Sequence, residues 1–119
     1  MSSLIRFGVV ADVQYADNED RLAWYDPTKT RYYRNSLAQV DKAFHNWNQQ
    51  QNDKIGFVLQ LGDIIDGINA QSKENHDSSL DAIKRTLNQF ESNSQIPTFH
   101  TVGESFICCF VEIMSYYCH

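Results

Sequence analysis

Two short apolar runs, LIRFGVV at residues 4–10 and IGFVLQL at residues 55–61, decide the fold of this chain. The first is apolar and β-branched and the second is a similar short apolar run, which is typical of buried strands. Each ends just before an aspartate, Asp12 after the first run and Asp63 after the second. A third run at residues 98–102 has the same character. The sequence therefore predicts three short strands.

Helical periodicity separates these strands. From Arg31 on, apolar residues recur at spacings of three and four, which predicts a helix with one apolar face: Tyr33, Leu37, Val40, Phe44 and Trp47. Asp77 or Ser78 can cap a second helix, whose predicted apolar face is Leu80, Ile83, Leu87 and Phe90. The alternation of strand and helix predicts parallel strands joined by helical connections, an α/β layer.

Residues 17–30 form a polar stretch that we expect to be a long loop, and such loops are often functional. Trp24 and Tyr25 within it, and Tyr15 just before it, either stack on a nucleobase or pack the loop against the fold. His45 is predicted to lie on the surface and His76 in a loop, because neither follows a strand.

The composition limits the class of protein. The chain has 119 residues, enough for one small domain, and a net charge of -5 that argues against nucleic acid and anionic membranes as partners. The amino-terminal residues lack the pattern of a signal peptide, and no apolar run reaches the roughly 20 residues of a membrane span. The three cysteines lie in the last dozen residues. We therefore expect a cytoplasmic protein without a disulfide framework.

The two aspartates carry the chemical prediction. Because the carboxyl ends of parallel strands meet at one edge of a sheet, we expect Asp12 and Asp63 side by side there. Two adjacent carboxylates repel each other unless a cation or a shared proton lies between them. Oxygen ligands suit Mg²⁺ or Mn²⁺, so a divalent metal site is predicted. The alternative is that each aspartate only caps a helix or shapes a turn.

Three segments resemble a known family: FGVVADVQYAD at residues 7–17, RYYRNSL at 31–37 and LGDIIDG at 61–67. The first and third resemble the opening motifs of the calcineurin-like metallophosphoesterases. Gln14 stands where most of that superfamily has histidine, which is similar to the manganese-dependent ADP-ribose/CDP-alcohol diphosphatases. The resemblance covers residues 4–103.

This resemblance implies a fold and an activity. The fold would be α/β, the N-terminal β-α-β-α-β portion of a metallophosphoesterase β-sandwich flanked by helices, and incomplete. Asp12 and Gln14 would bind the first of two metal ions, Mn²⁺ or Mg²⁺, and Asp63 would bridge both. The resemblance implies hydrolysis of the phosphoanhydride of ADP-ribose, CDP-choline and related nucleotide diphosphates, in which two such ions would activate a water molecule.

Arg31 and Arg34 are candidate diphosphate contacts, because a guanidinium group binds phosphate with two parallel hydrogen bonds. The alternative, which we favour slightly from the sequence, is that both are solvated residues at the start of a helix.

The pattern departs from the family after Gly103. Glu104 and Ser105 stand where the family has the asparagine and histidine of its next motif. We divide the chain into residues 1–103, the N-terminal part of a metallophosphoesterase domain, and residues 104–119, a divergent apolar tail. The abrupt change predicts that the tail is the product of a retained intron or a frameshift, and its apolar composition predicts self-association.

Two alternative functions follow. A catalytically inactive, truncated form of the enzyme would bind at most one metal ion or a partner. From a different class, a flavodoxin-like nucleotide- or phospho-acceptor-binding module ranks last, because the sequence has neither GxGxxG nor GxxxxGK[ST]. For the chain alone we expect weak stability or aggregation, because three strands leave a sheet edge open.

Overall fold

A computed structural model describes residues 5–50, 54–71, 76–93 and 95–101. The proposed boundary at Gly103, the tail at residues 104–119 and its predicted self-association lie outside the described residues.

A parallel sheet forms the centre of the described fold. Its strands are β1 (Phe7–Val10), β4 (Phe57–Gln60) and β5 (Thr98–His100), in the spatial order β1-β4-β5. Gly8 pairs with Val58, and Val58 pairs in turn with Thr98. The expected α/β layer with parallel strands is confirmed, although each strand is a few residues shorter than the apolar run that predicted it.

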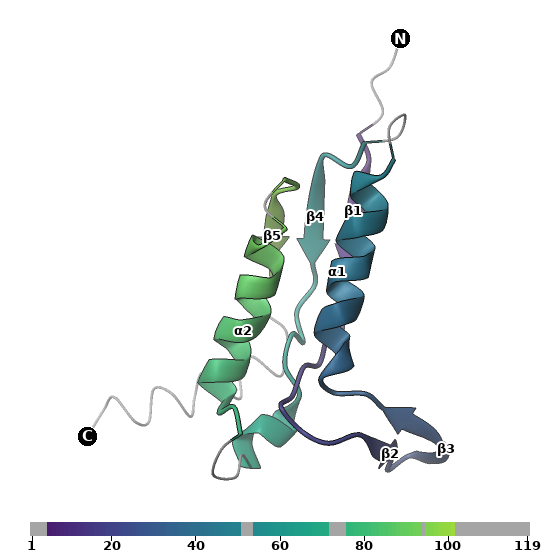
Figure 1. The fold of residues 1–119 in the computed structure, drawn as a ribbon, viewed down its shortest axis with the longest axis vertical. Coiled ribbons are helices and arrows are strands. Elements are labelled where there is room, and N and C mark those ends of the chain that lie inside the picture. Colours follow the sequence, from purple (N-terminus) through teal and green to yellow (C-terminus); the bar gives the residue numbers. More distant parts are fainter. Residues whose placement is uncertain (1–4, 51–53, 72–75, 94, 102–119) are drawn as a thin grey trace, which may run out of the picture.

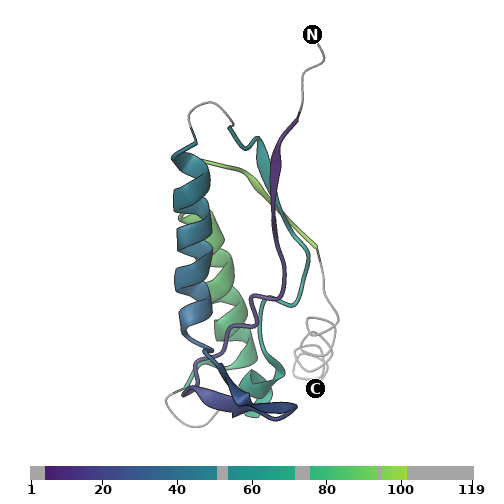
Figure 2. The same ribbon diagram turned by 90° about the vertical axis from the view of Figure 1, so that its right-hand side faces the viewer.

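Two helices cover one face of this sheet (Figures 1 and 2). Helix α1 (Asn35–Asn48) connects toward β4, and α2 (Ser79–Glu91) connects to β5. Ser78 caps α2: its hydroxyl accepts a hydrogen bond from the Asp81 amide and donates one to the Asp81 carboxylate at 2.6 Å. Asp81 also places negative charge in the first turn, where the helix dipole favours it. A short 3-10 helix, η1 (Gly67–Gln71), precedes α2.

The segment expected as a loop contains a β-hairpin. Strands β2 (Arg21–Ala23) and β3 (Asp26–Arg31) pair antiparallel at the end of the molecule where the sheet strands finish (Figure 1). Just after the turn, the Asp26 carboxylate accepts hydrogen bonds from the amide and hydroxyl of Thr28 at the start of β3. The loop prediction was wrong because β3 is exposed along most of its length and shows no alternation of apolar and polar residues.

Because the hairpin extends to Arg31, α1 begins later than the sequence predicts. The apolar periodicity between Tyr33 and Trp47 predicted a helix from Arg31, but Arg31 ends β3 and the helix begins at Asn35. Tyr33 is buried, as its place in the stripe requires, yet it lies in the connection between the two elements.

The core lies between the helices and the sheet. Phe44 of α1 is fully buried and makes edge-on ring contacts with Trp47 and with Phe90 of α2, at centroid distances of 5.3 Å and 5.9 Å. The buried face of α2 is rotated by about one residue from the prediction, since Ala82, Ile83, Thr86 and Phe90 are buried while Leu80 is 36% exposed.

The other face of the sheet is apolar and exposed. Phe7 stacks on Phe57 at 5.3 Å, and Phe57 meets Phe99 edge-on at 5.8 Å. Phe7 and Val9 are each 49% exposed and Phe99 is 59% exposed. Among the described residues, no helix is both long enough and apolar enough to cross a membrane.

Candidate functional site

The two strand ends that carry the predicted metal ligands stay paired after the sheet itself finishes. The Leu61 amide donates to the Val10 carbonyl at 2.9 Å, and the Gln14 amide donates to the Asp63 carbonyl at 2.9 Å. A further parallel bridge joins Tyr15 to Ile65. The main chains of Gln14 and Asp63 are therefore in direct contact, and Asp12 lies in the segment between the two bonded points.

The backbone is unusual at all three predicted ligands. Asp12, Gln14 and Asp63 have φ angles of 51°, 44° and 49°, and they are the non-glycine residues with positive φ among the described residues. Gly62, just before Asp63, has φ 95°. A left-handed conformation is unfavourable for residues with a Cβ and concentrates at functional sites, where the surrounding structure holds it. The strain thus falls on the residues that the sequence assigned to a metal.

Arg31 contacts one of these residues. Its guanidinium group donates to the Gln14 side-chain oxygen at 2.8 Å and to the Asp66 carboxylate at 2.5 Å, and it lies over the Tyr33 ring at 5.2 Å. Its side chain is 24% exposed and that of Asp66 is 13% exposed. The alternative of a solvated arginine at a helix start is therefore wrong for Arg31.

Asp66 was missed as a site residue. The pair Asp66-Gly67 is typical of a turn, and Asp66 accepts a hydrogen bond from the Ile68 amide in the first turn of η1. Its other oxygen holds Arg31, so one carboxylate shapes the turn and orients the guanidinium group. No sequence pattern links Asp66 to Arg31, because 35 positions separate them.

The donor atoms at the strand ends are suited to a hard cation. Asp12 is exposed and Gln14 and Asp63 are half-buried, so their side chains are open to solvent. Two carboxylates and an amide oxygen match the ligand preference of Mn²⁺ and Mg²⁺. Within the described part of the chain, no group of three or more His, Cys, Asp or Glu side chains gathers as a metal site. Glu104 and Ser105 fall outside the described residues.

Arg34 has a different environment from Arg31. It donates to Asp17 at 2.7 Å and to Glu19 at 2.8 Å, and its side chain is 45% exposed. These bonds raise the pKa of Arg34 above its ordinary value, with Glu19 as the larger cause. The same arginine lowers the pKa of Asp17 and of Glu19. Arg34 thus ties the segment before the hairpin to the start of α1.

A second group of charges joins that segment to α2. The Tyr15 hydroxyl and the Arg85 guanidinium group both donate to Asp77, at 2.9 Å and 2.6 Å. Burial, followed by the bond to Asp77, raises the pKa of Tyr15 to about 12. The bond from Arg85 is the main cause that lowers the pKa of Asp77. Tyr15 is buried, so the packing alternative is confirmed for it and stacking on a nucleobase is excluded.

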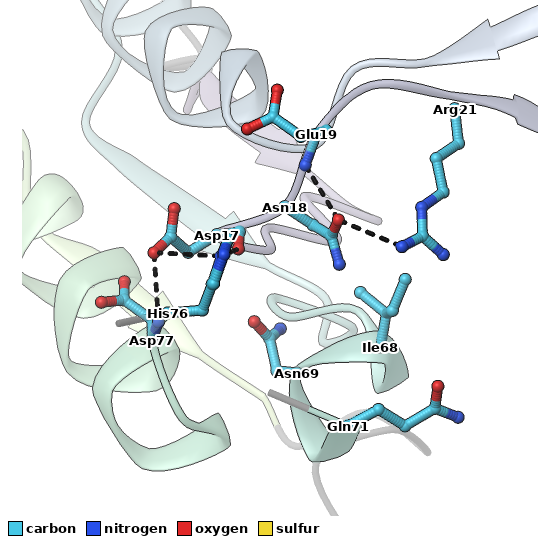
Figure 3. A pocket seen from close by; sticks show the side chains of 9 residues that line it. All are labelled: Asp17, Asn18, Glu19, Arg21, Ile68, Asn69, Gln71, His76 and Asp77. Carbon is cyan, nitrogen blue, oxygen red and sulfur yellow. Dashed lines mark hydrogen bonds and ion pairs between the residues drawn. The ribbon is translucent and has the colours of Figure 1, made fainter. Parts of the chain in front are cut away.

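A polar cavity of about 200 Å³ lies beside these charges (Figure 3). His76 contacts the Asp17 carbonyl oxygen at 2.6 Å, and the Asp77 amide donates to the Asp17 carboxylate at 3.1 Å. The cavity lining includes neither the strand-end aspartates nor Gln14. It is also smaller than the roughly 300 Å³ at which small-molecule pockets begin. We therefore place the candidate site at the strand ends and treat this cavity as part of the loop packing.

The remaining predicted side chains lie on the surface. Trp24 is 86% exposed and Tyr25 is 61% exposed, and their rings meet edge-on at 5.7 Å. Both lie at the turn of the hairpin, so stacking on a nucleobase stays open for them. His45 is exposed, as expected.

In a comparison with known proteins, the matching relatives all carry the same name. The chain is 44% identical over 100 residues to the manganese-dependent ADP-ribose/CDP-alcohol diphosphatase of Bos taurus, covering 84% of this chain and 28% of that protein. The protein of the same name from Homo sapiens is 43% identical over 103 residues, covering 84% and 27%. The one from Arabidopsis thaliana is 41% identical over 100 residues, covering 84% and 29%.

The chain spans less than a third of the length of these relatives. No family model matches it, and no solved structure matches it. These three matches, which share one name, are 41–44% identical and each covers 84% of this chain. Over that part of its length, the chain is therefore similar to the manganese-dependent ADP-ribose/CDP-alcohol diphosphatases.

Proposed function

We propose that this chain carries the first half of a metallophosphoesterase metal site, with Asp12 and Gln14 as ligands of one Mn²⁺ and Asp63 as a ligand shared with a second. The observation that supports this most directly is the left-handed backbone at these three residues. A fold accepts such strain where another requirement outweighs it, and ion ligation is a requirement that fits their oxygen atoms.

We propose the hydrolysis of the phosphoanhydride of ADP-ribose, CDP-choline and related nucleotide diphosphates as the corresponding activity. The names of the relatives support this substrate class. Bound metal would activate a water molecule and neutralise charge on the attacked phosphate. Mg²⁺ is the second candidate ion, because the ligand atoms are the same.

Arg31 is the side chain of this chain best suited to hold the diphosphate. Asp66 fixes its guanidinium group at the strand ends beside Gln14. A guanidinium group in that position can present further donors to phosphate oxygens with little loss of side-chain freedom. Arg34 is less suited, since its guanidinium group pairs with Asp17 and Glu19 and not with the strand-end residue Gln14.

The runner-up proposal is a catalytically inactive form that binds one metal ion. The structure supports it through the same three residues, and the departure at Glu104 and Ser105 motivates it. The cytoplasm remains our proposed compartment, and self-association through the tail remains a proposal for the assembly.

Two measurements separate these proposals. Wild type and Asp63→Ala are compared for ADP-ribose hydrolysis with Mn²⁺ and for Mn²⁺ binding by electron paramagnetic resonance. Turnover that Asp63→Ala abolishes supports the diphosphatase. Binding without turnover, lost in Asp63→Ala, supports the inactive form. Binding that Asp12→Ala and Asp63→Ala leave unchanged contradicts both.

Arg31 has its own test. Arg31→Lys retains the charge but loses the planar group, and we expect KM for ADP-ribose to rise about tenfold, as for the loss of a bidentate phosphate contact. Arg34→Lys is the matched control and should leave KM unchanged. Equal effects of the two substitutions would contradict a specific role for Arg31.

A further inference from the structure

Gln60 is a polar residue in an apolar place. It ends β4, is 0% exposed, and alternates along the strand with the exposed sheet face, so it lies on the face covered by the helices. Its side-chain nitrogen donates to the Gly62 carbonyl at 2.7 Å. Its side-chain oxygen has no hydrogen-bond partner among the described residues. An apolar side chain of the same length would avoid this buried, unpaired oxygen.

The hydrogen bond from the Gln60 side chain to Gly62 restricts the turn that precedes Asp63. The Gly62 carbonyl and the Asp63 amide belong to one planar peptide group. The hydrogen bond from Gln60 to the Gly62 carbonyl oxygen therefore restricts rotation of the peptide plane between Gly62 and Asp63. The two residues have φ angles of 95° and 49°. Without a partner, this pair of left-handed residues would have many conformations available, since glycine restricts the chain least.

Gln60 is itself firmly anchored. Its main chain pairs with Val10 on one side and with His100 on the other. Its carbonyl also accepts hydrogen bonds from the amide and the hydroxyl of Thr101, at 2.8 Å and 3.1 Å. Position 60 is therefore held on both sides, in the central strand of the described sheet and two residues before Gly62.

We propose that Gln60 is a positioning residue for the metal site: its amide fixes the Gly62–Asp63 peptide in the conformation that directs the Asp63 carboxylate to the ion. This rests on the proposed function, in which Asp63 is a ligand. This role explains the unpaired side-chain oxygen of Gln60. The side-chain amide supplies the N–H donor that the turn needs, but it also carries an oxygen for which the core offers no hydrogen-bond donor among the described residues.

The test compares Gln60→Met with wild type in the full chain. Methionine has a similar length and fits apolar surroundings but cannot donate to Gly62. We expect the Mn²⁺ dissociation constant, from electron paramagnetic resonance of free Mn²⁺, to rise about 10- to 100-fold, as for other residues that orient a metal ligand. The melting temperature should change little, because the lost bond and the removed unpaired oxygen offset each other.

Thr86→Val is the matched control. Thr86 is also 0% exposed and donates one hydrogen bond, to the Ala82 carbonyl at 2.9 Å, but it lies in the middle of α2. Its substitution should leave Mn²⁺ affinity unchanged. If Gln60→Met does not fold, Gln60→Asn retains the amide with one carbon fewer and should weaken Mn²⁺ binding in the same way.

A measurement without metal completes the test. In the metal-free chain, the ¹⁵N heteronuclear relaxation of Asp63 should show larger backbone motion in Gln60→Met than in wild type. Unchanged Asp63 relaxation overturns the inference, as does wild-type Mn²⁺ affinity in a folded Gln60→Met chain. Increased motion of Asp63 in a chain whose wild type does not bind Mn²⁺ supports the role of Gln60 in the turn and contradicts the proposed function alone.

Discussion

Three residues at the strand ends have both a strained backbone and a side-chain oxygen suited to a metal ion. Asp12, Gln14 and Asp63 all have left-handed backbone, although none is a glycine. Glycine at these positions would remove the steric penalty and also the side-chain oxygen that the proposed metal site uses. Stability and metal binding should therefore respond in opposite directions to the same substitution, which is the expected behaviour of functional residues.

Asp12→Gly tests this opposition. Relief of the left-handed conformation contributes roughly 1–2 kcal/mol, and the greater freedom of glycine in the unfolded chain offsets about 0.5–1 kcal/mol of that. We expect a free energy of unfolding equal to or slightly above that of wild type, measured in urea, together with weaker Mn²⁺ binding.

Asp20→Gly is the control for Asp12→Gly, since Asp20 is exposed in the same region and does not have a positive φ. It should lose about 0.5–1 kcal/mol through the unfolded state alone. A loss of that size in Asp12→Gly as well would show that the fold does not strain position 12.

At the scale of elements, one close contact limits how helix α1 packs against strand β1. In β1, a Cβ built on Gly8 would come within 2.8 Å of the Trp47 ring of α1. Trp47 is held in turn by its edge-on contact with Phe44. The glycine therefore sets how closely α1 approaches β1.

Gly8→Ala should destabilise the fold by about 1–3 kcal/mol, the usual effect of overpacking a core. The double variant Gly8→Ala/Trp47→Leu should show a coupling energy that opposes the sum of the single effects. Additive losses in a double-mutant cycle, followed by urea unfolding, would mean that the ring moves aside at little energetic expense.

The carboxylate of Asp77 connects Tyr15 to α2 and makes this junction sensitive to acid. Its folded pKa is lowered from 3.8. Its stabilising effect is therefore fully present above its unfolded pKa and is lost as the pH falls through the lower, folded pKa. We expect Asp77→Asn to lose roughly 1–2 kcal/mol at pH 7 and to show a smaller further loss than wild type between pH 5 and pH 2.

Urea unfolding at several pH values measures the effect of Asp77. Asp20→Asn, at an exposed position of the preceding loop, should retain the acid dependence of wild type. Parallel curves for wild type and Asp77→Asn would exclude Asp77 as a source of acid sensitivity.

At the scale of the whole molecule, α1 and α2 cover one face of the sheet (Figure 2). The other face is apolar and is not covered by another element of the described residues. Side chains on the uncovered face are large and exposed: Phe7, Val9 and Phe99. Apolar patches of this kind favour association, and the outer strands β1 and β5 also leave main-chain groups without a neighbouring strand among the described residues. The structure thus supplies a second physical reason to expect aggregation, independent of the tail.

Phe99→Lys places a charge on this face at a position that is 59% exposed, so it should cost little stability. We expect it to reduce concentration-dependent association, measured by size-exclusion chromatography with light scattering. Trp24→Lys changes an even more exposed ring, 86% accessible, but on the hairpin. An equal reduction by Trp24→Lys would show that general charge, and not the sheet face, controls association.

Much of the element order could be predicted from the sequence, and the sequence also indicates the candidate ligands, whose role stays a prediction. The runs that end at Asp12 and Asp63 are local patterns, and the stripe through Val40 and Phe44 is a property of one helix. The hairpin could not be predicted, because β3 is exposed and polar and is stabilised by pairing with β2, not by its own pattern.

The sequence by itself determined which residues stand at the strand ends and which chemistry their oxygen atoms favour. The tertiary structure alone decided how they are held: the left-handed backbone of Asp12, the bond from Arg31 to Gln14, and the buried amide of Gln60 behind Asp63. The physical reason is that ligand identity is a property of one side chain. Its orientation depends on hydrogen bonds and on a backbone conformation that the surrounding fold imposes.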